Sequence, residues 1–312
     1  MSTRAPDRSL SGRVALVTGG TGGIGLSTAV GLARRGAEVV VTGRDPERGH
    51  AAVRRIAEAA GIAPEAVHLR IADLGVLGDV RRLADGILAD HPRLHLLVNN
   101  AGVNHGSRRS TPDGLEANLA VNAVAPVLLT RLLLGRLAAS AEPGRAPRVV
   151  LVNSGAHKMV RRAVDALDDP QAEAGPYVAM TVYARSKLLV LMAGLALARE
   201  PGTGPVTVTA VDPGPADTGM TRAMDRTFLP PAMRAGWGLY YRLGPARRSA
   251  DTAAASTLAA ASSAALEGRT GIYLDAKGRP ARTSPAARDE AAHGAALALL
   301  DDFGADTRTT RL

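Results

Sequence analysis

The sequence predicts an α/β protein built on a doubly wound parallel sheet of about seven strands, with helices on both faces. Three observations lead to this fold class. Short apolar runs alternate with longer segments of helical character, which is typical of parallel strands joined by crossover helices. The centres of several runs are fully apolar, as at residues 14–17, 39–41 and 149–152, which is expected of strands that are buried on both faces. The first run, residues 14–18, ends in a glycine cluster that leads into a helix.

Each expected element follows from its own stretch of sequence. The apolar runs predict strands at residues 14–18, 38–42, 67–71, 94–99, 148–153, 206–211 and 271–274. The stretches between them predict helices at residues 27–35, 46–60, 76–89, 115–138, 177–199, 249–265 and 284–300. Pro46 falls in the first turn of its helix, where proline is favoured. Since no linker or repeat interrupts the pattern, we expect one domain over residues 12–303, with loose termini at 1–11 and 304–312.

The composition excludes several classes of protein. The 312 residues carry a formal net charge of +9, but the arginines are scattered and only 3% of residues are aromatic, so we expect no nucleic-acid partner. Without cysteine, the chain has no disulfide, thiolate ligand or cysteine nucleophile, and we predict no metal site. No apolar run reaches about 18 residues, so we expect no transmembrane segment. Residues 1–11 lack the apolar core of a signal peptide, and we expect a cytoplasmic protein.

The glycine cluster is the first candidate binding site. Glycines let the chain turn sharply and let its backbone approach a pyrophosphate, while the helix that follows offers free N–H groups. The cluster fits two patterns, GxGxxG from Gly20 or TGxxxGxG from Thr18. Either pattern alone also fits a glycine-rich turn that binds nothing. The choice therefore depends on residues further along the chain.

The residue after the second strand bears on the choice of dinucleotide, since ligands of an open parallel sheet bind beyond the carboxyl ends of its strands. An NAD enzyme usually places an acid there, about 20 residues beyond the glycines. This chain has Arg44, followed by Asp45. A guanidinium suits a 2′-phosphate and favours NADP over NAD. The alternative is that Arg44 is a solvated charge and that Asp45 caps the helix beginning at Pro46.

The next two strands also end in polar residues. Asp73 follows the third strand, and Asn99 and Asn100 end the fourth. The Asp73 carboxylate suits an adenine amino group, or it caps the next helix. The two amides bridge the sheet backbone and a cofactor, or they form turns. Spacing alone leaves both roles open at each position.

The fifth strand and the helix after it supply groups for carbonyl chemistry. Ser154 ends the strand, while Tyr183 and Lys187 are four residues apart and share one helix face. A phenol has a pKa of about 10, which a neighbouring ammonium and a nicotinamide charge would lower. Tyr183 would then exchange a proton with a substrate oxygen that Ser154 holds. The alternative is a surface tyrosine with a lysine partner.

Together these residues resemble the motifs of the short-chain dehydrogenase/reductase family over about residues 12–300. The markers stand in the family's order: Thr18, Gly19, Gly23, Gly25, Asp73, Leu74, Asn99, Asn100, Ala101, Gly102, Asn122, Ser154, Tyr183, Lys187, Pro213, Gly214 and Thr218. The resemblance is strongest to the retinol-dehydrogenase-like branch. Its cues are the Ser-Gly-Ala-His-Lys run from Ser154, the long insertion before Tyr183, the Gly-Ile-Tyr run from Gly271, and the Ser-Pro pair at Ser284. The resemblance implies a Rossmann-type fold and selects the TGxxxGxG pattern.

The resemblance also implies a role for each marker. Tyr183 is the acid/base, and Lys187 holds the nicotinamide ribose and tunes Tyr183. Ser154 orients the substrate oxygen, and Asn122 holds a water of the proton relay. The implied cofactor contacts are Gly19, Thr21, Gly22, Gly23, Ile24, Arg44, Asp73, Leu74, Asn99, Asn100, Ala101, Gly102, Tyr183, Lys187, Pro213, Gly214 and Thr218. One departure is Asp212, where this branch often has histidine.

The function that follows is an NADP-dependent oxidoreductase that transfers a hydride between nicotinamide and a small-molecule carbonyl/alcohol substrate. One alternative is an epimerase or dehydratase that recycles its NAD on the same scaffold. Arg44 and the short C-terminal part of the chain oppose it. Another is a non-catalytic NADP-binding scaffold protein, which a complete set of Asn122, Ser154, Tyr183 and Lys187 opposes.

Two further features concern partners. The stretches 115–138 and 177–198 are too apolar for surface helices, so we expect a homodimer or homotetramer. Residues 219–248 are expected to cover the substrate. They mix arginines with methionines and with Phe228, Trp237, Tyr240 and Tyr241, which suits a lipophilic substrate and contact with a membrane surface.

Overall fold

The sheet is the frame of the molecule. The computed structural model describes residues 8–229 and 248–305. In those residues one parallel sheet has the strand order β3-β2-β1-β4-β5-β6-β7. The strands are β1 (Val14–Val17), β2 (Glu38–Gly43), β3 (Val67–Ile71), β4 (Leu96–Asn99), β5 (Arg148–Val152), β6 (Thr207–Val211) and β7 (Ile272–Leu274). The predicted fold class and its seven strands are confirmed.

The order of the strands fixes where a ligand can bind. The chain runs outward from β1 to β3, returns to the centre, and then runs outward the other way from β4 to β7. The connections after β1 and β4 therefore leave the sheet on opposite sides, which opens a crevice at the carboxyl ends of these two strands.

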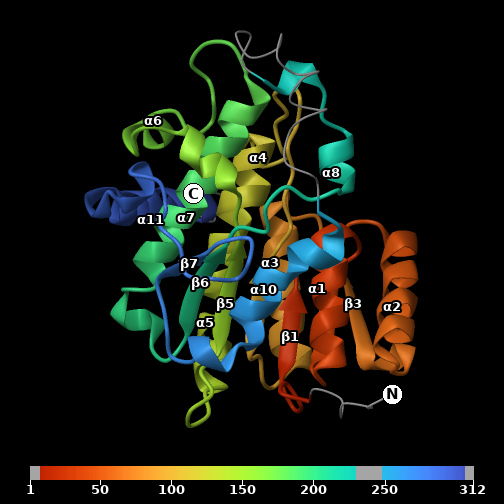
Figure 1. Ribbon diagram of the computed structural model, residues 1–312. Helices are drawn as coiled ribbons and strands as arrows, with labels where there is room; N and C mark the ends of the chain where they lie inside the picture. The colour runs from red at the N-terminus through yellow and green to blue at the C-terminus, as the bar shows by residue number, and fades with distance from the viewer. Residues whose placement is uncertain (1–7, 230–247, 306–312) are drawn as a thin grey trace, which may run out of the picture.

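Two layers of helix cover the sheet (Figure 1). One face carries α1 (Gly23–Arg34), α2 (Pro46–Ala60) and α10 (Ala250–Ser262). The other carries α3 (Leu77–Asp90), α5 (Ala125–Ala139), α7 (Ala179–Leu197) and α11 (Glu290–Gly304). Alternate strand residues feed the two cores, so Leu16 packs on one side and Ala15 and Val17 pack on the other.

Short helices and single turns connect the strands and the longer helices. The short helices are α4 (Ala117–Leu119), α6 (Val164–Leu167) and α8 (Gly219–Arg222), and a π turn, η2, spans Ala120–Val124. The 3₁₀ turns are η1 (Pro64–Ala66), η3 (Gly155–Met159), η4 (Pro201–Thr203), η5 (Arg226–Phe228), η7 (Ala264–Leu266) and η8 (Ala286–Arg288).

Several boundaries differ from the sequence predictions. Helix α1 begins at Gly23 rather than at residue 27, because the glycines themselves form its first turn. The helix predicted at 115–138 is interrupted by η2, and the last helix begins at Glu290 after the turn η8. Leu10 is buried and its N–H donates to the Arg35 carbonyl, while α11 continues through Gly304. The packed chain thus extends slightly past residues 12 and 303.

The two most apolar helical stretches lie inside the fold. Ala117–Ala139 and Ala179–Leu197 are long and apolar enough to cross a membrane, but 83% and 67% of their most apolar windows are buried within this chain. Helix α11 packs against α7 and α5 and supplies much of this cover. Other parts of the same chain cover most of these two helices, so their apolar character does not require a partner subunit. The homodimer or homotetramer stays a prediction.

An arginine clamp holds α11 in place. Arg131 on α5 donates to both carboxylate oxygens of Glu200, which follows α7, and to both of Asp301 on α11. The two acids raise the pKa of the Arg131 guanidinium. Arg131 is 29% exposed, so these charge-assisted bonds are partly protected from solvent and should contribute more than surface pairs do.

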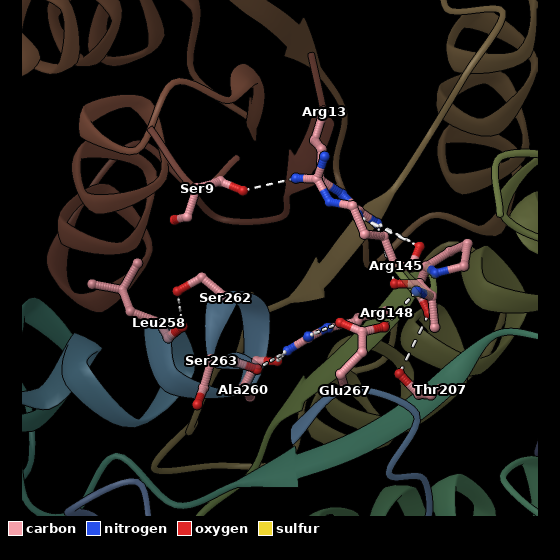
Figure 2. A network of polar contacts seen from close by, with 12 residues as sticks. Ser9, Arg13, Arg145, Arg148, Thr207, Leu258, Ala260, Ser262, Ser263 and Glu267 are labelled. Carbon is pink, nitrogen blue, oxygen red and sulfur yellow. Dashed lines mark hydrogen bonds and ion pairs between the residues drawn. The ribbon is translucent and has the colours of Figure 1, made fainter. Parts of the chain in front are cut away.

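A second polar network ties the amino ends of the strands together, on the edge away from the crevice (Figure 2). Arg148 on β5 donates to the carbonyls of Ala260 and Ser263 at the end of α10 and pairs with Glu267 at 2.6 Å. Arg13 donates to the carbonyl of Ala146. A cation at the carboxyl end of a helix is stabilising. These buried charges therefore serve the fold, while the opposite edge is left for function.

We predict that Arg131→Met lowers the free energy of unfolding by about 1–3 kcal/mol, because it removes four charge-assisted bonds and keeps the apolar stem. Arg162→Met is the matched control, since the exposed Arg162 pairs with Asp165 one turn away and its loss should leave stability unchanged. Urea unfolding followed by circular dichroism measures both. Equal stability of the two variants would contradict the clamp.

Candidate active site

A large cavity lies at the carboxyl ends of the strands. Its volume is about 1420 Å³, more than the roughly 300–1,000 Å³ of a typical small-molecule pocket. Ser154, Tyr183 and Lys187 line it. The expected cofactor contacts that line it are Gly19, Thr21, Gly22, Gly23, Ile24, Arg44, Asp73, Leu74, Asn100, Ala101, Gly102, Tyr183, Lys187, Pro213, Gly214 and Thr218. Asn99 and Asn122 do not line it.

The glycine loop has the geometry of a phosphate cradle. Gly19 has a φ of +64°, and a Cβ on Gly25 would lie 2.3 Å from the Gly19 carbonyl oxygen. Only glycine fits so close an approach of α1 to the loop. The N-cap of α1 is Gly22, with no side-chain cap and no acid in the first turn. The N-terminus of α1 thus offers its backbone N–H groups to an anion, and the site fits a dinucleotide pyrophosphate.

Residues that follow β4 hold the glycine loop through hydrogen bonds. The Asn100 amide donates to the carbonyl oxygens of Thr18 and Gly19, at 2.8 and 3.3 Å. The Thr18 hydroxyl accepts from the backbone N–H groups of Asn100 and Ala101. Asn100 therefore bridges the sheet and the glycine loop at the cavity wall.

Asn99 and Asp73 bond to the protein itself. The Asn99 amide is buried and donates to Thr130 on α5 at 3.1 Å, so its side chain points away from the cavity. This corrects its expected cofactor contact, and the reason is that β4 side chains alternate between the two faces of the sheet. The Asp73 carboxylate accepts from the Gly75 N–H at 2.9 Å and thereby shapes its own turn at the cavity wall.

Two arginines, rather than one, line the cavity beside the end of β2. Arg44 ends the β2 turn, and Arg48 lies in the first turn of α2 with its Nη2 3.8 Å from the position of a Cβ on Gly22. Asp45 caps α2 by accepting from the Arg48 N–H at 3.1 Å, which is the alternative role that the sequence left open for it. Arg48 was missed, although an Asp-Pro cap places the residue three positions after Asp45 in the first turn.

Three catalytic candidates line the same cavity. Ser154 follows β5, and Tyr183 and Lys187 lie on α7. Burial raises the pKa of the Tyr183 phenol to about 12, the Ser154 hydroxyl acts to lower it, and Asp212 raises it further. The expected lowering of the Tyr183 pKa is therefore wrong for the chain's own residues, because desolvation disfavours the phenolate.

Lys187 donates to the backbone at the end of β5 and lies over the Tyr183 ring. Its Nζ donates to the Val152 carbonyl at 2.9 Å and stands 5.9 Å from the centre of the Tyr183 ring. Burial lowers the pKa of Lys187 to about 8. The Lys187 ammonium thus lies at the cavity wall beside the end of β5.

Asn122 sits in the π turn behind the site. Its side-chain oxygen accepts from the Val103 N–H at 2.8 Å, and its amide donates to the Val103 carbonyl and to Ser186 Oγ. These bonds hold the loop after β4 against α7. The side chain is occupied with protein partners, and the expected role of Asn122 as holder of a relay water stays a prediction.

A buried acid supports the same loop. Glu116 is fully buried, caps α4 through the Leu119 N–H, and accepts from Asn118 and the Tyr177 hydroxyl. Asn118 in turn accepts from the His105 N–H. This network was not predicted from the sequence, although Asn118 stands four residues before Asn122 and so shares its helix face.

His157 supports the Ser154 turn. Its Nδ1 lies 2.8 Å from the Ser154 carbonyl, and its Nε2 accepts from the Ser284 N–H at 3.3 Å. The backbone N–H of Ser284 can only donate, so Nδ1 carries the proton. Burial lowers the pKa of His157, which keeps the ring neutral and this arrangement intact.

Part of the cavity lining consists of flexible apolar side chains, namely Met159, Met180, Met220, Met224 and Leu229. Phe228 is buried, with its ring 3.1 Å from the position of a Cβ on Gly106. The expected covering segment thus begins against the loop after β4. Its central part, with Trp237, Tyr240 and Tyr241, lies outside the described residues.

A parallel sheet with a glycine cradle, a cavity at its carboxyl ends and a Ser-Tyr-Lys set defines a dinucleotide-dependent oxidoreductase. Comparisons with known proteins support this class of protein. A family model described as short chain dehydrogenase matches residues 13–166. Polyprenol dehydrogenase of Mus musculus is 40% identical over 284 residues, which cover 89% of this chain and 80% of that protein.

Retinol dehydrogenase 12 of Bos taurus is 40% identical over 210 residues, covering 67% of this chain and 63% of that protein. The solved structure of the RhlG/NADP active-site complex of Pseudomonas aeruginosa has 29% identity and a TM-score of 0.67, and covers 88% of this chain and 98% of that one. The chain belongs to the short-chain dehydrogenase/reductase family, an oxidoreductase family that uses NAD(P). Its resemblance to the retinol-dehydrogenase-like branch is confirmed.

We predict that Gly25→Ala lowers the free energy of unfolding by about 3 kcal/mol or more and abolishes dinucleotide binding, because backbone atoms at 2.3 Å cannot move aside cheaply. Gly22→Ala is the matched control for folding, since its Cβ would meet nothing closer than 3.8 Å and its backbone is extended. Thermal unfolding and cofactor fluorescence measure both effects. A Gly25→Ala protein as stable as Gly22→Ala would refute the close packing.

Proposed function

We propose that the chain is an NADP-dependent oxidoreductase that transfers a hydride between the nicotinamide and a lipophilic carbonyl or alcohol, with Tyr183 as the acid/base. The observation that supports this most is the placement of Ser154 and Tyr183 in one cavity with the glycine cradle. When bound, the dinucleotide supplies or accepts the hydride. The neighbours of Tyr183 set how readily it gives or takes a proton.

In the direction of reduction, Ser154 donates a hydrogen bond to the substrate carbonyl oxygen and holds it beside Tyr183. As the carbonyl carbon is reduced, the negative charge that would develop on the substrate oxygen would be neutralised by the Tyr183 proton. Bulk solvent then returns a proton to the phenolate. Oxidation of the alcohol is the same path in reverse, with Tyr183 as the base.

Arg44 and Arg48 support the preference for NADP. Both line the cavity at the end of β2, and two guanidinium groups provide several donors for the dianionic 2′-phosphate. Asp45, the acid closest to this position, is occupied in capping α2. It therefore competes poorly for the ribose hydroxyls of NAD.

The methionine-lined end of the cavity supports a lipophilic substrate. Methionine side chains adapt to irregular apolar shapes, and four of them face this space. Two relatives are named for polyprenol and retinol as substrates. We extend that chemical class, and neither compound in particular, to this chain. A cytoplasmic location, contact with a membrane surface and a homo-oligomeric state accompany this proposal as predictions.

Mixing the purified protein with NADPH and a panel of aldehydes and ketones, and following the loss of NADPH absorbance, tests the activity. We expect turnover that improves, through falling KM, as the alkyl chain of the substrate lengthens. Tyr183→Phe should lose turnover by a factor of about 100 or more and retain NADPH binding, because the ring remains and only the proton is lost. Undiminished turnover in this variant would assign the proton to another group.

Arg44→Ala and Arg48→Ala should each raise the Kd for NADPH by a factor of about 10 and leave the Kd for NADH nearly unchanged, because only NADPH carries the 2′-phosphate. Arg55→Ala, an exposed arginine on α2 away from the cavity, is the control. Fluorescence titration with both cofactors gives the constants. Equal losses for NADPH and NADH would contradict the proposed 2′-phosphate site.

A further inference from the structure

The loop after β4 is pinned on both sides of Asn104. The Asn122 side chain accepts from the Val103 N–H at 2.8 Å and donates to the Val103 carbonyl at 2.9 Å. Asn118, four residues earlier, accepts from the His105 N–H at 3.2 Å. These bonds turn the main-chain groups of residues 103 and 105 toward the helical stretch, as alternate residues of an extended chain do. Asn104 is therefore held at a fixed place in the cavity wall, which it lines.

The Asn104 side-chain oxygen has no partner in the protein. The oxygen is buried, and it accepts no hydrogen bond from the described residues. By contrast, the amides of Asn100, Asn118 and Asn122 all bond to protein groups. A buried polar atom without a partner lowers the stability of a fold. The requirements of folding therefore do not explain an asparagine at this position.

The cavity wall on either side of Asn104 is apolar. Two residues before it, a Cβ on Gly102 would lie 3.8 Å from Met220 Cε. Two residues after it, a Cβ on Gly106 would lie 3.1 Å from the Phe228 ring. Both apolar side chains belong to the segment that is expected to cover the substrate. A hydrogen bond between Asn104 and a ligand would thus be shielded from water, which strengthens it.

Asn104 is set apart from the catalytic candidates along the same loop. A Cβ on Gly102 would lie 3.6 Å from Lys187 Nζ, so the loop passes Lys187 at Gly102. Two extended residues then advance the chain by about 7 Å to Asn104. A substrate that reaches both places must carry two polar groups that are several bonds apart.

We propose that Asn104 is a specificity-determining residue that binds a hydroxyl of the substrate, several bonds away from the reacting carbonyl. A hydroxyl donates to an amide oxygen and accepts from amide N–H groups, so it pairs with either end of the amide. The last torsion of asparagine is broad and two-fold, and no protein partner of the oxygen opposes its rotation toward the cavity. The substrate class that follows is a lipophilic hydroxyketone, or the corresponding diol in the direction of oxidation. This inference rests on the proposed function.

Matched ketones test the inference by binding alone. Each probe is a methyl ketone that ends either in a tert-butyl group or in a 2-hydroxypropan-2-yl group, with an alkyl chain of varied length between the two ends. The pair differs by one hydroxyl in place of one methyl of similar size. Titration calorimetry of the protein loaded with NADP⁺ gives each Kd without turnover, because NADP⁺ cannot reduce a ketone and a tertiary alcohol cannot be oxidised. We expect the hydroxyl to lower the Kd by a factor of about 10 at a favoured chain length.

Asn104→Leu keeps the size of the side chain and removes its polar atoms. The preference should reverse in this variant, since a buried hydroxyl without a partner is unfavourable, and the Kd for NADPH should stay unchanged. Ser107→Ala is the control, because Ser107 is exposed on the same loop and lies outside the cavity lining. It should keep the native preference.

Three results of this titration would overturn the proposal. The first is a native protein that shows no preference for the hydroxyl at any chain length. The second is an Asn104→Leu protein that keeps the native preference. The third is a weaker binding of NADPH by Asn104→Leu, which would assign the amide to the cofactor.

A stability measurement separates a ligand-binding amide from a structural one. Asn104→Leu should leave the midpoint of thermal unfolding unchanged or raise it, because the buried oxygen has no protein partner to lose. Asn118→Leu is the contrast, since the Asn118 amide donates to Glu116 and to the Tyr177 hydroxyl, and its midpoint should fall. An equal fall in both variants would make Asn104 a structural residue and refute the inference.

Binding and turnover together distinguish this inference from the proposed function. If the hydroxyl preference depends on Asn104 while NADPH reduces none of the ketones, the hydroxyl site stands and the proposed function fails. If NADPH reduces the ketones and the hydroxyl gives no advantage, the proposed function stands and the role of Asn104 is refuted.

Discussion

Burial of the parallel sheet on both faces is the constraint on which the rest of this protein depends. Strands that are covered by helices on either side can present polar groups only at their two ends. At the amino ends, Arg13 and Arg148 bond to carbonyls and to Glu267, and bind the layers together. At the carboxyl ends, the reversal of strand order between β1 and β4 opens the cavity. One edge of the sheet thus serves the fold, and the other serves the chemistry.

The cavity is held in shape by residues that do not line it. Asn122 fixes the loop after β4, Glu116 fixes the start of the same helical stretch, and His157 fixes the turn at Ser154. Each one satisfies buried backbone groups that loops at a sheet edge would otherwise leave unpaired. Precise placement of a few reacting groups requires this kind of support, since small misplacements cost large factors in rate.

Local signals made much of the structure predictable from sequence. Helix α2 has the expected bounds because both of its ends are marked in the sequence. Asp45 is its N-cap and Pro46 its first residue, and Gly61 ends it in the left-handed conformation. Ser154, Tyr183 and Lys187 were found because strand-end and i,i+4 positions meet predictably in a parallel sheet. Nearly all of the expected cofactor contacts line the cavity for the same reason, and the Asn99 side chain does not, because adjacent strand residues face opposite sides.

What could not be predicted depends on burial and on contacts between distant segments. The pKa of Tyr183 is raised because desolvation outweighs the effect expected of Lys187, and no sequence pattern reports desolvation. The cover that α11 gives to α7 and the clamp at Arg131 join residues up to 170 positions apart. The π turn at Asn122 replaces a regular helix that the apolar pattern alone indicates. Each of these features follows from tertiary packing.

The most direct test of the account is a crystal structure of the protein with NADP⁺. The account predicts the pyrophosphate at the N-terminus of α1, the 2′-phosphate between Arg44 and Arg48, and the nicotinamide in the part of the cavity that Tyr183 and Asp212 line. A dinucleotide bound at another edge of the sheet, or one whose nicotinamide lies away from Tyr183, would contradict it.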